Sequence, residues 1–99
     1  RELTVDLPRV SDLPAVKAEP EEVIINITEN GALIVQEKVW KLAELGEMLK
    51  TMTRVYSRPP SVIIRADRDV KYAYPVDVIA VCGAAGIHEI AFVTWKSPE

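Results

Sequence analysis

Residues 61–94 read SVIIRADRDVKYAYPVDVIAVCGAAGIHEIAFVT, and this stretch decides the fold. Ser61 to Ala66 form a short apolar run, typical of a strand that is covered by other elements. A charged turn follows at 67–71, and a helix is predicted from about Pro75, because proline suits the first helical turn. Gly86 is predicted to end that helix. A last strand over 88–95 completes a strand–helix–strand unit, whose two strands should be parallel with a right-handed crossover.

The sequence before this unit predicts a hairpin and a second helix. A β-rich strand over 23–28 is followed by Glu29-Asn30-Gly31, a turn in which Asn-Gly tolerates the positive φ of tight hairpins. A return strand is predicted at 33–35. From about Trp40 to Tyr56 the apolar residues recur at helical spacing, and Pro59-Pro60 end the helix. The predicted order is therefore β-β-α-β-α-β.

This order predicts one α+β domain over residues 23–99. We expect a two-layer sandwich with a mixed four-stranded sheet and both helices on one face. Residues 1–22 differ in composition, because prolines at 8, 14 and 20 alternate with acidic residues. Proline fixes φ and removes a hydrogen-bond donor, so this part is predicted to be a flexible extended linker.

The linker contains a short duplication, Asp6-Leu7-Pro8-Arg9-Val10 and Asp12-Leu13-Pro14-Ala15-Val16. In so short a biased segment the duplication has two interpretations, chance and an extended docking motif. The docking interpretation predicts that partner contacts come from the apolar and proline positions, which are Val5, Leu7, Pro8, Val10, Leu13 and Pro14. An extended segment of this kind can pair with an exposed sheet edge.

The second helix carries a surface pattern that goes beyond fold. Val78, Ile79 and Cys82 are predicted to face the sheet. The opposite side holds Asp77 and three small residues, Ala80, Gly83 and Ala84. Alanine alone is explained by helix propensity, but an interior glycine costs up to about 1 kcal/mol. The small side is therefore a candidate contact surface for a dimer or a partner.

Composition limits the function classes. The chain has 99 residues and is at most one domain. Its net charge of −3 argues against nucleic-acid binding, which needs a basic face. No apolar run is long enough to span a bilayer, and no signal peptide is recognisable, so the chain is interpreted as a fragment or mature segment. One cysteine cannot form an internal disulfide.

Candidate catalytic groups are sparse. His88 and Cys82 could form a nucleophile–base pair, but no third orienting group is evident and Cys82 lies on the predicted core face. Asp67 and Asp69 lie between a strand and a helix, where aspartate usually makes turns and caps. We therefore predict that Asp67 is structural. No catalytic residue, metal ligand or cofactor site is predicted, and the chain is interpreted as a small non-enzymatic interaction domain.

An ordered set of short matches resembles the periplasmic domain of the ExbD/TolR biopolymer-transport family. The linker contributes Val5-Asp6-Leu7-Pro8, and the hairpin contributes 29–31 with 33–35. The strongest block, without gaps, consists of Ile63-Ile64-Arg65-Ala66-Asp67, Val70, Tyr72, Val76, Ala85-Gly86-Ile87 and Phe92-Val93-Thr94. Trp40 departs from the family pattern, as do Pro75, Ala80, Gly83 and Ala84.

The resemblance implies a function in force transduction. It implies a single-pass inner-membrane subunit whose periplasmic domain follows a membrane helix that lies outside residues 1–99. Such subunits dimerise inside an ExbB/TolQ-like membrane protein and use the proton-motive force to act on a TonB- or TolA-like envelope protein. A TolR-type role with peptidoglycan contact remains open. A small-molecule-binding regulatory α+β domain is the alternative of a different class.

Overall fold

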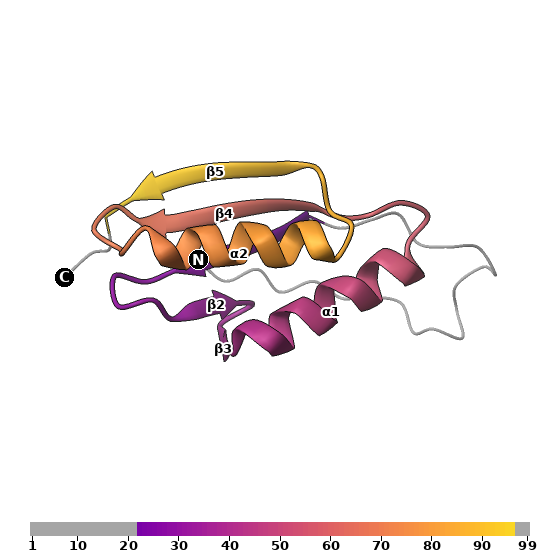
Figure 1. The fold of residues 1–99 in the computed structure, drawn as a ribbon, viewed down its shortest axis with the longest axis horizontal. Coiled ribbons are helices and arrows are strands. Elements are labelled where there is room, and N and C mark those ends of the chain that lie inside the picture. The colour runs from indigo at the N-terminus through magenta and orange to yellow at the C-terminus, as the bar shows by residue number, and fades with distance from the viewer. Residues whose placement is uncertain (1–21, 97–99) are drawn as a thin grey trace.

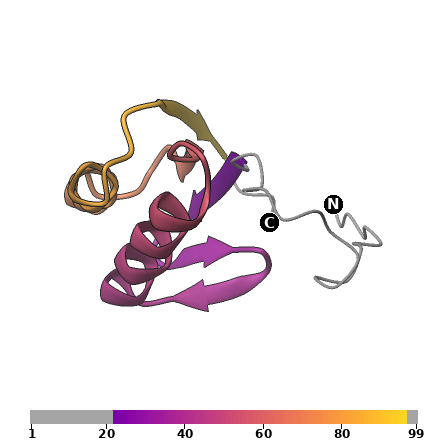
Figure 2. The same ribbon diagram turned by 90° about the vertical axis from the view of Figure 1, so that its right-hand side faces the viewer.

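The computed structural model describes residues 22–96, which form two helices and a five-stranded mixed sheet. The strands are β1 (Glu22–Ile27), β2 (Leu33–Val35), β3 (Lys38–Trp40), β4 (Ser61–Asp67) and β5 (Ile90–Trp95). The helices are α1 (Leu42–Val55) and α2 (Ala73–Ala84). Their arrangement is seen in Figure 1, and Figure 2 shows both helices on the same side of the sheet.

The strand order is β3-β2-β1-β4-β5, with β1, β4 and β5 parallel and β2 and β3 antiparallel. The predicted α+β class, the mixed sheet and the parallel final strand pair are thus confirmed. In the parallel part Ile25 lies opposite Ile64, and Ile64 lies opposite Phe92. Side chains alternate between the faces of a strand, so this register places the three side chains on one face. Ile25 and Ile64 are buried in the core, while Phe92 on the edge strand is half exposed.

The predicted number of four strands is wrong, because the sequence pattern does not reveal β3. Residues 38–40 pair with β2 through a two-residue turn, in which Gln36 and Glu37 have φ values of 52° and 66°. Such turns usually contain Asn or Gly, so Gln-Glu gives no turn signal. Trp40 consequently lies in β3, although its spacing predicts a place in the first helix, and α1 begins at Leu42.

Local interactions explain where the helices begin and end. The Lys41 N–H donates to Oε1 of Glu44 at 2.9 Å, which satisfies one backbone donor at the start of α1. Gly86, with φ at 85°, follows the last turn of α2. There Gly86 N–H donates to Gly83 O and Ile87 N–H donates to Cys82 O, each at 3.0 Å. This pair of bonds is the Schellman ending, and it confirms Gly86 as the helix stop.

The core lies between the helices and the inner face of the sheet. Its buried apolar residues are Val23, Ile25, Ile27, Leu33, Val35, Leu45, Leu49, Val62, Ile64, Ala66, Val78, Cys82, Ala85 and Ile87.

One core prediction is wrong. Ile79, which was expected to face the sheet beside Val78 and Cys82, is 41% exposed. The buried positions of α2 are Pro75, Val78 and Cys82, three and four residues apart. Ile79 lies at about 40° from Pro75 on the helical wheel, on the side away from Val78, so it falls at the margin of this stripe. Since α2 is apolar on several sides, the sequence alone did not identify its core face.

Candidate functional site

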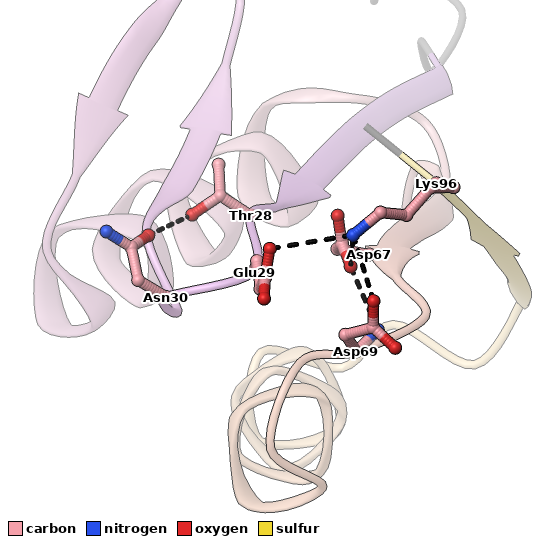
Figure 3. A network of polar contacts seen from close by, with 6 residues as sticks. All are labelled: Thr28, Glu29, Asn30, Asp67, Asp69 and Lys96. Atoms are coloured by element: carbon pink, nitrogen blue, oxygen red, sulfur yellow. Dashed lines mark hydrogen bonds and ion pairs between the residues drawn. The ribbon is translucent and has the colours of Figure 1, made fainter. Parts of the chain in front are cut away.

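A charged cluster joins two turns and the end of β5 at one end of the sheet (Figure 3). Lys96 Nζ lies 2.9 Å from Asp69 Oδ2, 3.6 Å from Glu29 Oε1 and 3.9 Å from Asp67 Oδ1. The hydrogen bond to Asp69 raises the pKa of Lys96, and the neighbouring carboxylates act in the same direction. The ammonium thus links the end of β5 to the β1–β2 turn and to the β4–α2 turn.

Asp67 has a structural position at the end of β4. Its side chain is fully buried, and its Oδ1 accepts the Asp69 N–H at 2.9 Å. The Val70 N–H donates to the Asp67 carbonyl at 3.0 Å, and the Arg68 N–H donates to the Trp95 carbonyl at 2.8 Å. These contacts agree with the predicted turn-forming role. Within residues 22–96, no group of three or more His, Cys, Asp or Glu side chains is arranged to hold a metal ion.

The thiol of Cys82 is unsuited to nucleophilic attack. Cys82 is fully buried on the core side of α2, and burial raises the pKa of the thiol to about 11. The thiolate is the reactive form, so this environment makes it scarce at neutral pH. His88 is exposed in the loop before β5, and no hydrogen bond joins it to Cys82 in the described part of the chain. The two side chains thus do not form the nucleophile–base pair that the sequence analysis considered and did not favour.

The small side of α2 is open to solvent. Asp77, Ala80, Gly83 and Ala84 are all exposed, as the sequence pattern predicted. A Cβ atom added at Gly83 would meet nothing within 4 Å. The residues needed for a close backbone contact are therefore accessible, and their role as a dimer or partner surface stays a prediction.

Strand β5 forms one edge of the sheet, since β4 is its single neighbour among the described strands. Phe92 is 49% exposed and Val93 is 45% exposed, so the strand offers apolar side chains as well as unpaired backbone groups. The residues expected to pair with such an edge, Val5 to Pro14, lie outside the described residues.

Two features of the site region were not predicted. Lys96 was missed because its three acidic neighbours are distant in sequence. A hollow of about 190 Å³ was also missed; it lies between the β1–β2 turn, Trp40 and the first turns of α2 at Tyr74 and Asp77. Both features depend on tertiary packing. In addition, no helix within residues 22–96 has the length and apolar character that a membrane span requires.

Comparison with known proteins agrees with this architecture. The family model described as "Biopolymer transport protein ExbD/TolR" matches residues 1–97. No individual curated protein gives a match to the chain. The family match covers almost the whole sequence, including the hairpin, both helices and the parallel strand pair. The chain therefore belongs to the ExbD/TolR family of biopolymer transport proteins.

Proposed function

We propose that this chain is the periplasmic domain of a single-pass inner-membrane subunit of a motor driven by the proton-motive force. In this proposal a membrane helix outside residues 1–99 contacts an ExbB/TolQ-like protein, and the described domain engages a TonB- or TolA-like envelope protein. The family match over residues 1–97 carries the proposal. The open edge of β5 supports it, because an unpaired strand can capture an extended segment through backbone hydrogen bonds.

The proposed coupling uses the segment before β1. Its apolar positions Val5, Leu7, Val10 and Leu13 precede β1 in the sequence, and β1 is the strand in the middle of the sheet. We infer that this segment pairs with a strand edge supplied by a partner or by a second subunit. Because the segment connects the membrane helix to the domain, movement of that helix would then control whether the segment can bind the partner. Coupled ordering of this kind costs affinity but allows binding to be switched.

An NMR titration of residues 1–99 with the periplasmic domain of the TonB- or TolA-like protein from the same organism tests the proposed function. We expect the Leu7 and Val10 amides to become rigid in the complex. Val93→Lys on β5 places a charge on the proposed binding edge and should weaken binding about tenfold, a change of about 1.4 kcal/mol. Val39→Lys on β3 is the matched control, because Val39 is also an exposed valine on an edge strand.

Equal weakening by both variants would mean that β5 is not the binding edge. The proposed function would be contradicted if neither the TonB-like nor the TolA-like protein bound the domain. It would also be contradicted if Leu7 stayed mobile in a saturated complex. A parallel sedimentation assay with isolated peptidoglycan tests the TolR-type role, which predicts that the domain is retained by the polymer.

Homodimerisation is proposed through the small side of α2. Light scattering at increasing protein concentration should show a dimer. Gly83→Glu should weaken that dimer, because it places a long charged side chain on the small surface through which the two helices would approach each other. Ala43→Glu on the exposed surface of α1 is the control. A wild type that is monomeric at about millimolar concentration, or a Gly83→Glu variant that dimerises equally well, would contradict this surface assignment.

The alternative, a small-molecule regulatory domain, requires a pocket. Sites for such ligands usually measure about 300–1,000 Å³. The hollow beside Tyr74 measures about 190 Å³, which is better suited to one side chain than to a whole metabolite. A second hollow of about 390 Å³ reaches that range, but two of its four lining residues are charged: it is lined by Lys38, Val39, Trp40 and Glu44. The family match therefore carries the choice of the motor-subunit function over this alternative.

A further inference from the structure

The hollow beside Tyr74 is built from five parts of the fold, one of which is β2 with Leu33. The β1–β2 turn contributes Gly31 and Ala32, and β3 contributes Trp40. Leu42 comes from the start of α1, and the first turns of α2 add Tyr74 and the residues that follow it. The hollow thus lies where two helix beginnings meet the hairpin, on the helix side of the molecule, and its described lining includes no residue of β5.

Most of the wall is apolar. Leu33 and Val78 are buried, with 6% and 1% exposure, and form part of the core behind the hollow. Trp40 is held in place because its Nε1 donates to the Val35 carbonyl at 3.1 Å. A fixed apolar wall of this size favours the methylene stem of one long side chain, since burying each CH₂ group contributes about 0.8 kcal/mol.

Two polar groups at the hollow have no partner within residues 22–96. Neither the Asp77 carboxylate nor the Tyr74 hydroxyl makes a hydrogen bond or an ion pair with the described residues. Both residues are exposed, so a ligand can reach them from solvent. Since Asp77 is the one charged residue lining the hollow within the described part of the chain, the electrostatics favour a cationic group at the end of the apolar stem.

The aromatic faces distinguish between the two common cationic side chains. Lys38 Nζ already lies 5.5 Å from the centre of the Trp40 ring. The Tyr74 ring lies against Gly31, where an added Cβ would be 2.5 Å from Cε1. A guanidinium gains most from stacking on an open aromatic face and from bidentate pairing, whereas a compact ammonium needs neither. Because Lys38 already lies over the Trp40 ring and Gly31 lies against the Tyr74 ring, the hollow favours lysine over arginine.

We propose that this hollow is a binding site for a lysine side chain presented by a partner protein. The methylene stem lies against Trp40, Leu42 and Val78, and the ε-ammonium pairs with Asp77. The inference goes beyond the proposed motor function, because it assigns a second contact that is separate from the β5 edge and names the residue type that it selects.

The test uses residues 1–99 and the probe Nα-acetyl-L-lysine methylamide, followed by NMR of the Gly31, Ala32 and Asp77 amides. We expect saturable shifts confined to the hollow. The uncharged norleucine analogue should bind about three- to fivefold more weakly, which is the contribution of one exposed ion pair. Asp77→Asn should reduce lysine binding by the same factor, while Glu89→Gln, which removes an exposed carboxylate away from the hollow, should not.

The remaining outcomes would overturn the proposal. Equal binding of the norleucine analogue, or unchanged lysine binding by Asp77→Asn, would mean that the hollow does not select a cation. Shifts caused by n-butylamine but not by the lysine methylamide would indicate a free amine as the ligand and exclude a protein side chain. Absence of saturable shifts with every probe would show that the hollow is not a site. None of these results depends on the TonB- or TolA-like partner.

Discussion

Gly83→Ala and Gly31→Ala are the same substitution in two environments, and we predict opposite effects on stability. Gly83 lies in the last turn of α2, where a Cβ would meet nothing within 4 Å. Alanine is favoured over glycine in a helix interior by about 0.8–1 kcal/mol, and this difference is an upper limit for the last turn. Because no contact must be rearranged, part of that difference should be recovered as an increased free energy of unfolding.

Gly31 has φ at 93°, and its added Cβ would lie 2.5 Å from Cε1 of Tyr74. A left-handed backbone costs a residue with a Cβ about 1–2 kcal/mol. Displacing the Tyr74 ring from its rotamer adds about 0.5–1.5 kcal/mol. The two costs together predict destabilisation of about 2–3 kcal/mol.

Urea and thermal unfolding followed by circular dichroism measure both variants. For a domain of this size, 1 kcal/mol corresponds to about 4–8 °C in the melting temperature. We therefore expect Gly83→Ala to melt several degrees higher than the wild type and Gly31→Ala to melt clearly lower. The measurements should be made at low protein concentration, because a dimer would add its own stabilisation. A lower melting temperature for Gly83→Ala would refute the assignment of Gly83 to an open helix surface.

Two further predictions concern buried groups. Asp67→Ala should destabilise the domain by about 1–3 kcal/mol in urea unfolding, because the Asp69 N–H loses its acceptor and Lys96 loses one carboxylate. Asp67→Asn should retain more of the stability. An unchanged unfolding midpoint together with lost partner binding would give Asp67 a functional role instead. Cys82 should react with thiol reagents far more slowly in the native protein than in urea. Since burial raises the pKa of this thiol from its ordinary value of 9.0 to about 11, its stabilising contribution should be complete below pH 9 and lost between pH 9 and 11. Cys82→Ala should show a smaller alkaline loss of stability than the wild type, and an equal loss would contradict this origin.

The parts of the fold that sequence predicted correctly depend on local chemistry. Asn30-Gly31 supplied a hairpin turn, Pro59-Pro60 ended a helix, and Gly86 supplied the left-handed residue that a helix ending requires. The parallel strand pair followed from a general rule about crossover connections. These signals act over a few residues, so they can be interpreted without knowledge of the rest of the chain.

The features that sequence could not predict depend on packing between distant residues. The Gln36-Glu37 turn adopts positive φ values without the residues that favour them, so β3 was hidden. Ile79 was misplaced because several sides of α2 are apolar. Lys96 and the hollow beside Tyr74 exist because turns from separate parts of the chain meet, and no sequence period encodes such a meeting.

The parallel arrangement of β1, β4 and β5 has a mechanical consequence. Glu22 pairs with Ser61 at one end of the parallel ladder, and Trp95 pairs with Asp67 at the other. Tension applied between the start of β1 and the end of β5 therefore acts along the strands and loads their hydrogen bonds together, in shear. Bonds loaded together must break together, whereas bonds peeled from one end break in sequence. A domain entered through its central strand is thus suited to transmit a pull without opening.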